Sequence, residues 1–126
     1  MTASSLFDEP ARREWASLFL ARDGHHMLIA YIDDASAGFV SGVEMTHPDK
    51  GTEMFLYELG VAEEHRRSGV GRALVEALGQ VAIEQGCYGM WVGTEPDNVA
   101  AIATYQSGGA EDLEPFVTLS WSLAVH

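Results

Sequence analysis

The amino-acid sequence predicts a mixed α/β or α+β sandwich, in which helices lie beside one central sheet. Two observations predict this fold. The apolar residues switch between helical and strand spacing along the chain, in the order α-β-β-β-α-β-α-β. The 126 residues suffice for one hydrophobic core, and an apolar content of 47% indicates a folded chain rather than a disordered one. We therefore expect a single domain over residues 1–126.

The expected elements follow the spacing of apolar residues and the turn residues between them. No internal repeat, linker or low-complexity tract separates them. They are a helix over 8–22, strands over 26–33, 37–45 and 53–61, a helix over 69–85, a strand over 88–94, a helix over 97–109 and a strand over 115–125.

Capping and turn residues define the elements of the first half. Asp8 can cap the first helix, Pro10 lies in its first turn, and Gly24 lies just past its end. The turn at 33–36 joins the first two strands as a hairpin, and the turn-rich loop 46–52 leads into a third, largely buried strand.

In the second half the apolar spacing becomes helical after Gly69. Val70, Leu74, Leu78 and Val81 recur on one helical face, and Gly86 ends the helix. The helix over 97–109 ends at a pair of glycines, and alternating apolar residues after it predict the final strand.

Charge and cysteine content restrict the function classes. A net charge of −12 disfavours nonspecific nucleic-acid binding and favours cationic partners. The single Cys87 excludes an internal disulfide, so we expect a small buried hydrophobe and a cytoplasmic location. No secretory signal or membrane-spanning run is present. His25 and His26 are adjacent and have no spaced Cys or His partners, so we expect no metal site.

The segment "HRRSGVGRAL", residues 65–74, concentrates basic residues in this acidic chain. Arg66, Arg67 and Arg72 are three of its seven lysines and arginines. A glycine-rich turn that enters a helix presents unpaired backbone N–H groups to an anion. The segment lacks the lysine of a P-loop and the third glycine of a dinucleotide fingerprint. An anion cradle and a bare structural turn remain, and the three arginines favour the cradle.

Two motifs in this chain resemble a known family. The run Arg66-x-x-Gly69-x-Gly71 resembles the Arg/Gln-x-x-Gly-x-Gly/Ala signature of the GNAT superfamily of acetyl-CoA-dependent N-acetyltransferases. A second signature, Asn98-x-x-Ala101-x-x-x-Tyr105, follows in the expected order. Within the superfamily, segments 57–74 and 94–110 are similar to the aminoglycoside 3-N-acetyltransferases, which implies a role in antibiotic resistance.

The resemblance implies a GNAT-like fold with a mixed, mostly antiparallel central sheet flanked by helices. The first strand and first helix usual in the superfamily have no counterpart in this sequence, so either a partner subunit completes the site or the start is shortened. A homodimer is therefore among the expected assemblies. No metal cofactor is implied, and the cosubstrate is acetyl-CoA.

The resemblance also assigns the residues that would bind coenzyme A. The backbone of Leu59, Gly60 and Val61 would pair with its pantetheine arm, Asn98 would meet the coenzyme further along, and Tyr105 would lie near its sulfur. The loop and first helical turn would hold its pyrophosphate through Arg66, Arg67, Ser68, Gly69, Val70, Gly71 and Arg72.

Acetyl transfer to an amine needs a base, an acid and stabilisation of the carbonyl oxygen. We expect Tyr105 as the general acid, and the N–H of Leu59 or Gly60 as the hydrogen-bond donor to the carbonyl oxygen. Glu58 is the leading candidate for the base, although an exposed or paired strand carboxylate is an equal alternative. The weaker candidates are Glu53 and Glu95, and Asp97 is expected to cap the next helix.

The expected reaction transfers the acetyl group to a primary amine of a cationic, aminoglycoside-like small molecule. The alternatives are acetylation of a protein N-terminus or lysine, and a non-catalytic module that only binds acetyl-CoA. Glu111, Asp112 and Glu114 either form an acidic rim that attracts such an amine or belong to a solvated loop, which we expect. No nucleic-acid or membrane partner is expected.

Overall fold

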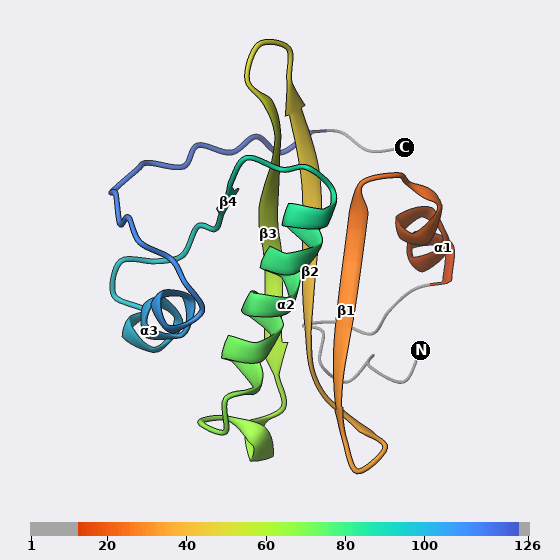
Figure 1. Ribbon diagram of the computed structural model, residues 1–126, viewed down its shortest axis with the longest axis vertical. Helices are drawn as coiled ribbons and strands as arrows, with labels where there is room; N and C mark the ends of the chain where they lie inside the picture. Colours follow the sequence, from red (N-terminus) through yellow and green to blue (C-terminus); the bar gives the residue numbers. More distant parts are fainter. Residues whose placement is uncertain (1–12, 124–126) are drawn as a thin grey trace.

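The sheet has four strands in the order β1-β2-β3-β4, and residues 13–123 are the part of the chain that this computed structural model describes (Figure 1). The strands are β1 (His25–Ile32), β2 (Ala35–His47), β3 (Gly51–Val61) and β4 (Met90–Trp91). β1, β2 and β3 pair antiparallel, whereas β4 pairs with β3 in parallel. The mixed, mostly antiparallel sheet is therefore confirmed.

Within residues 13–123, three α-helices and one short 3-10 helix lie around the sheet. They are α1 (Arg13–Ala21), η2 (Glu63–His65), α2 (Val70–Glu84) and α3 (Val99–Ser107). In Figure 1, α2 lies in front of β2 and β3 and runs along them, whereas α1 and α3 lie on opposite sides of the sheet, α1 beside β1. β3 is thus followed by η2 and then by the start of α2, which begins within the glycine-rich segment as predicted.

The core lies between α2 and the face of β2 and β3 that it covers. Leu74 and Leu78 on α2 are at most 4% exposed, and Val40, Met54 and Leu56 on the strands are at most 1% exposed. Burial of side chains of this size stabilises the fold by roughly 1.5–3 kcal/mol each. The predicted helical apolar face is thus the one that docks α2 on the sheet.

The β1–β2 hairpin turns at Asp33 and Asp34, inside the segment that the sequence predicts. Both residues have positive φ angles, 49° and 65°, which a two-residue turn with the twist of a hairpin requires. Aspartate tolerates this conformation better than most residues. Because the turn needs only these two residues, β2 begins at Ala35, earlier than predicted.

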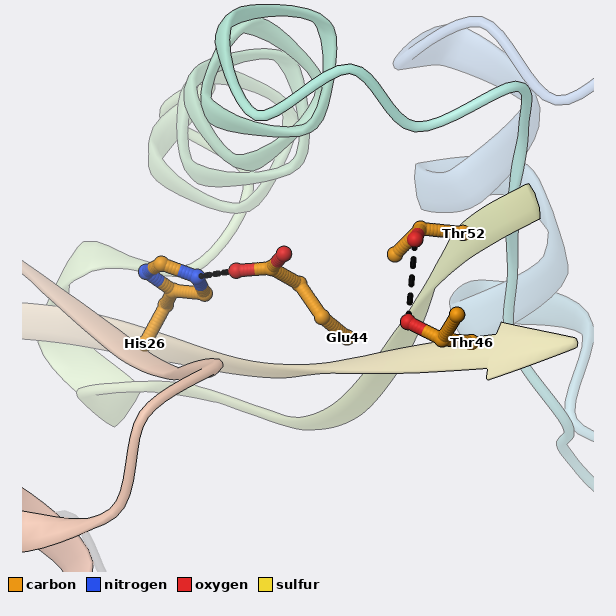
Figure 2. Close-up of polar contacts among 4 residues, drawn as sticks. All are labelled: His26, Glu44, Thr46 and Thr52. Atoms are coloured by element: carbon orange, nitrogen blue, oxygen red, sulfur yellow. Dashed lines mark hydrogen bonds and ion pairs between the residues drawn. The ribbon is translucent and has the colours of Figure 1, made fainter.

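Side-chain contacts join neighbouring strands of the sheet (Figure 2). His26 Nε2 and Glu44 Oε2 are 2.6 Å apart, which joins β1 to β2, and both side chains are largely buried. Thr46 Oγ1 and Thr52 Oγ1 are 2.9 Å apart and join β2 to β3 near their turn. Within residues 13–123 no group of three His, Cys, Asp or Glu side chains is placed to hold a metal ion.

Cys87 is half-buried and packs against the core. Burial, and secondly the charge of Glu44, raise the pKa of its thiol, so the thiol stays protonated at neutral pH. A protonated, packed thiol is a small apolar side chain, as the sequence predicts.

The strand predicted over 88–94 is much shorter than expected. Only Met90 and Trp91 pair with β3, opposite Met54 and Phe55. Phe55 and Trp91 stack there with ring centroids 4.4 Å apart. Beyond this pair the two strands separate, because the chain turns away toward α3. The prediction failed because alternating apolar residues indicate a strand but do not show how many of its residues pair with the neighbouring strand.

The final strand predicted over 115–125 is wrong for the residues that the structure describes. No strand forms over 115–123, and the side chains of this segment are 60–83% exposed: Phe116, Val117, Leu119, Trp121 and Leu123. Alternating apolar residues favour a strand, but a strand also needs a neighbour that accepts its backbone hydrogen bonds. Nothing in residues 13–123 supplies one. The predicted end at Val125 lies outside the described residues.

α1 ends at Ala21, one residue before the predicted end of the first helix. The predicted cap Asp8 and Pro10 lie outside the described residues. No helix within residues 13–123 is long and apolar enough to cross a bilayer.

Candidate functional site

A cavity of about 1210 Å³ lies beside the second half of β3, the loop after it, the start of α2, and α3. Eleven of the thirteen predicted site residues line it: Glu58, Leu59, Gly60, Val61, Arg66, Arg67, Gly69, Gly71, Arg72, Asn98 and Tyr105. The side chains of Ser68 and Val70 do not. Ser68 donates its hydroxyl to the carbonyl oxygen of His65, and Val70 enters the core. Segments as distant in the sequence as those of Glu58 and Tyr105 therefore meet at one place.

The separation of β3 from β4 opens this cavity. β4 pairs with β3 only as far as Phe55, so no strand of the described part of the chain pairs with the edge of β3 at Leu59–Val61 on the β4 side. Its other edge pairs with β2, where Leu59 lies opposite Val40. A free strand edge presents backbone donors and acceptors in an extended row. An extended, amide-bearing ligand can pair with such an edge.

The start of α2 adds an anion-binding terminus to the same cavity. Gly69 is the N-cap, with a φ of 86° and no side-chain hydrogen bond to the helix. The N–H of Ala73 is the first to bond within the helix, to the carbonyl oxygen of Gly69 at 3.0 Å. The three preceding N–H groups, from Val70 to Arg72, therefore have no partner within the helix. With the helix dipole they attract an anion.

The two glycines of the loop serve different purposes. Gly69 occupies a left-handed conformation, and a β-carbon there would meet nothing within 4 Å. A β-carbon on Gly71 would instead lie 3.0 Å from Cγ2 of Thr104. Gly71 therefore lets α2 approach α3 closely, and both glycines line the cavity, where a role in coenzyme binding remains a prediction.

The three arginines surround this helix terminus. Arg72 Nε lies 2.7 Å from Glu76 Oε1, one turn further along α2. Arg66 donates from Nε to the carbonyl oxygen of Val61 at 3.4 Å, which links the loop back to β3. Arg67 has a positive φ of 65°, uncommon for a residue with a side chain. The predicted concentration of positive charge at the start of α2 is therefore present in space.

α3 presents Asn98 and Tyr105 to the cavity. Asn98 is the N-cap of α3, and its Oδ1 accepts a hydrogen bond from the N–H of Ala101 at 3.1 Å. The expectation that Asp97 caps this helix is wrong. Tyr105 is half-buried, and burial raises the pKa of its phenol. The phenol is therefore protonated at neutral pH and can donate a proton.

Among the predicted carboxylates, only Glu58 lies on this cavity. Glu53 lies outside it and accepts a hydrogen bond from the hydroxyl of Tyr88 at 3.0 Å. Glu95 is exposed and also lies outside. The geometry therefore leaves Glu58 as the candidate base of the three. The cavity is also lined by residues that the sequence analysis did not predict: Phe39, Tyr57, Thr94 and Thr104. Of these, Tyr57 could have been predicted from its position next to Glu58.

A second cavity of about 930 Å³ shares Tyr105 with the first. Its aromatic lining consists of Tyr88, Trp91, Tyr105 and Phe116. The acidic residues Glu111, Asp112 and Glu114, for which a solvated loop was the expected role, also line it. Tyr105 thus lies between a basic cavity and a cavity that carries three carboxylates.

Comparison with known proteins identifies a family. The profile of the acetyltransferase (GNAT) family matches residues 2–109. The ribosomal protein bS18-alanine N-acetyltransferase of Escherichia coli (strain K12) is 37% identical over 57 residues, which cover 45% of this chain and 38% of that protein. The matched segments span only 38–40% of the first curated relatives.

Solved structures share the fold. An aminoglycoside acetyltransferase from an uncultured soil metagenomic sample, in complex with trehalose, superposes with a TM-score of 0.83 at 20% identity, covering 94% of this chain and 78% of that chain. The aminoglycoside N-acetyltransferase AAC(6′)-Iy in complex with CoA gives a TM-score of 0.76 at 23% identity, covering 87% of this chain and 85% of the other.

Proposed function

This chain belongs to the GNAT acetyltransferase family, and on that premise we propose that it transfers an acetyl group from acetyl-CoA to a primary amine of a cationic small molecule. The observation that carries the proposal is the single cavity in which the free edge of β3, the uncapped start of α2, and Tyr105 meet. Residues 1–126 are proposed to act as one domain, in the cytoplasm.

The residues of the cavity fit coenzyme A. Its pyrophosphate needs N–H donors and positive charge, which the start of α2 and Arg66, Arg67 and Arg72 supply. Its pantetheine arm contains amides that can pair with the free edge at Leu59–Val61. When bound, acetyl-CoA supplies the acetyl thioester.

Three groups of this chain serve the proposed reaction. Glu58 accepts a proton from the substrate ammonium, because only the neutral amine is a nucleophile. The backbone N–H of Leu59 or Gly60 donates a hydrogen bond to the carbonyl oxygen as negative charge develops on it. The phenol of Tyr105 donates a proton to the leaving thiolate, and its raised pKa keeps that proton available at neutral pH.

The acceptor is proposed to be cationic and aminoglycoside-like. Glu111, Asp112 and Glu114 line the cavity next to Tyr105, and carboxylates there raise the local concentration of a polyamine. The solved structure with bound CoA is that of an enzyme named for the 6′ position of aminoglycosides. It therefore supports the resemblance to aminoglycoside acetyltransferases in general and not to the 3-N type in particular. Acetylation of a protein N-terminus is the second candidate, since a sequence relative is named for the alanine of a ribosomal protein.

An acceptor screen tests the proposal. The purified protein is incubated with acetyl-CoA and one amine of each class: an aminoglycoside, a peptide with a free N-terminal alanine, and a lysine peptide with a blocked N-terminus. Release of free thiol is followed against a control without amine. Turnover with the aminoglycoside supports the proposal, and turnover with a peptide alone favours the second candidate. If acetyl-CoA binds and no amine reacts, the chain is a binding module instead.

We also propose a homodimer, because the apolar side chains of segment 116–123 are mostly exposed. Light scattering after size-exclusion chromatography should give twice the mass of 13.7 kDa. Replacing Val117, Leu119 and Trp121 by serine should restore the monomer mass, whereas a wild-type monomer contradicts the proposal.

A further inference from the structure

Ser41 has a buried hydroxyl to which the proposed reaction assigns no role. Ser41 is 1% exposed, and its Oγ has no hydrogen-bond partner among the groups of residues 13–123. Leaving a buried hydroxyl unpaired costs folding free energy, and such groups usually mark a bound water or a functional contact. The position of Ser41 in the sheet shows which contact is available.

Ser41 lies on the face of β2 that is turned away from α2. The neighbouring glycines establish this direction: a β-carbon on Gly38 would meet Leu74 and Val70 of α2, and one on Gly42 would meet Leu78. Because successive side chains of a strand alternate between faces, the residue before Gly42 points to the opposite side. Ser41 is therefore outside the core between the sheet and α2.

The register places Glu58 directly opposite Ser41. The two residues are Cα partners in the β2–β3 pairing. Residues directly opposite each other in an antiparallel pair point to the same face, with β-carbons roughly 4.5–5.5 Å apart. A serine hydroxyl and a glutamate carboxylate at this separation are within reach of a direct hydrogen bond or of one bridging water.

A β-bulge at Tyr57 is what brings Glu58 to this face. The pairing passes from Gly42 with Leu56 to Ser41 with Glu58, so Tyr57 is the extra residue. Before the bulge, Met54 and Leu56 are buried in the core. After it, Leu59 and Val61 pack against that core, so the alternation has shifted by one residue. Glu58 thereby avoids the apolar face and shares the other face with Ser41.

We propose that Ser41 is a positioning residue for Glu58. Its hydroxyl, which is unpaired in this structure, donates a hydrogen bond to the carboxylate when the exposed Glu58 side chain turns toward it, and holds it where it accepts the proton of the substrate ammonium. The proton passes from the ammonium nitrogen to the carboxylate, and Ser41 keeps its own. The inference rests on the proposed function through the role of Glu58.

A kinetic cycle tests this role. Ser41→Ala should lower kcat about tenfold and leave the affinity for acetyl-CoA unchanged, because the coenzyme cavity does not include Ser41. Ser41→Cys, which keeps the volume but has a much weaker donor, should lose as much, whereas Ser41→Thr, which keeps the hydroxyl, should retain more activity. In a Glu58→Ala background, Ser41→Ala should cause no further loss. An equal loss in both backgrounds would overturn the proposal.

A stability cycle keeps the inference testable if no amine reacts. Urea midpoints are measured for wild type, Ser41→Ala, Glu58→Ala and the double variant. A hydrogen bond between the two residues predicts that the double variant loses less than the sum of the single losses. Additive losses would overturn the link between Ser41 and Glu58. A wild type without turnover but with coupled midpoints would refute the proposed function alone.

Discussion

The first turn of α2 lies directly against α3 at Gly71 and Thr104. A β-carbon on Gly71 would lie 3.0 Å from Cγ2 of Thr104, closer than side chains normally pack. Thr104 cannot easily rotate away, because its hydroxyl donates to the carbonyl oxygen of Ala100 at 3.0 Å. This contact fixes the distance between the anion-binding end of α2 and the helix that carries Tyr105.

Gly71→Ala is therefore expected to destabilise the fold by about 1–3 kcal/mol, the usual cost of overpacking. The cost exceeds the gain of about 0.5–1 kcal/mol that alanine brings to a helix. Chemical denaturation measures the free energy of unfolding. Thr104→Ser removes the methyl group that alanine would meet, so the double variant should recover most of the loss.

Gly79→Ala in the same helix is the matched control. Its β-carbon would lie 3.7 Å from Cε of Met90, an ordinary contact, so the variant should be stabilised by about 0.5–1 kcal/mol. If the two variants had the same free energy of unfolding, the close contact between Gly71 and Thr104 would be contradicted.

Arg72→Glu should weaken binding of acetyl-CoA by about tenfold to a hundredfold, because it reverses a charge beside the phosphate-binding helix terminus. Titration calorimetry measures the affinity. The fold should change little, since the Arg72–Glu76 pair is exposed and contributes little. Arg22→Glu makes the same change of charge at an exposed position away from the cavity and should bind normally. Equal affinities of the two variants would contradict the assignment of the loop.

Tyr105→Phe should keep the affinity for acetyl-CoA and lower kcat by a factor on the order of 10²–10⁴, the usual contribution of a general acid. Phenylalanine retains the ring that packs against the core, so folding should be preserved. Steady-state thiol release and calorimetry separate the two effects. An unchanged kcat would remove Tyr105 from the acid role.

Burial raises the pKa of Tyr105, which has a consequence for stability. The native state holds the phenolic proton more tightly than the unfolded chain, whose tyrosine pKa is about 10. This contribution is complete below about pH 10 and is lost as the pH rises through the higher native value. The urea midpoint should therefore fall more steeply above about pH 10 in wild type than in Tyr105→Phe. Tyr57→Phe, at an exposed position, should behave like wild type.

Asn98 caps α3, and a contact with coenzyme A is also predicted for it, so substitutions can test the two roles separately. Asn98→Ala removes the cap of α3 and should cost about 1 kcal/mol of stability. Asn98→Ser keeps a capping oxygen and should be nearly as stable as wild type. If Asn98 also contacts the coenzyme, both variants should bind acetyl-CoA more weakly. If Asn98→Ser bound acetyl-CoA with normal affinity, Asn98 would serve only as the cap of α3.

Much of the candidate site is predictable because its parts are local. The arginine and glycine spacing from Arg66 to Arg72 marks a turn that enters a helix, and the apolar spacing after it marks the helix itself. Tyr105 follows from its distance along the chain from Asn98. Ser41 could not be found in this way, because its partner Glu58 is defined by the register of two strands and by a bulge at Tyr57.

The sequence alone determined the order of the elements as far as α3, the hairpin turn at Asp33 and Asp34, and the family motifs, because each depends on residues a few positions apart. Only the tertiary structure decided where β4 leaves β3, that Tyr105 separates two cavities, and that segment 115–123 forms no strand. These features depend on which distant backbone groups find partners. Spacing along a single chain does not specify such long-range pairing.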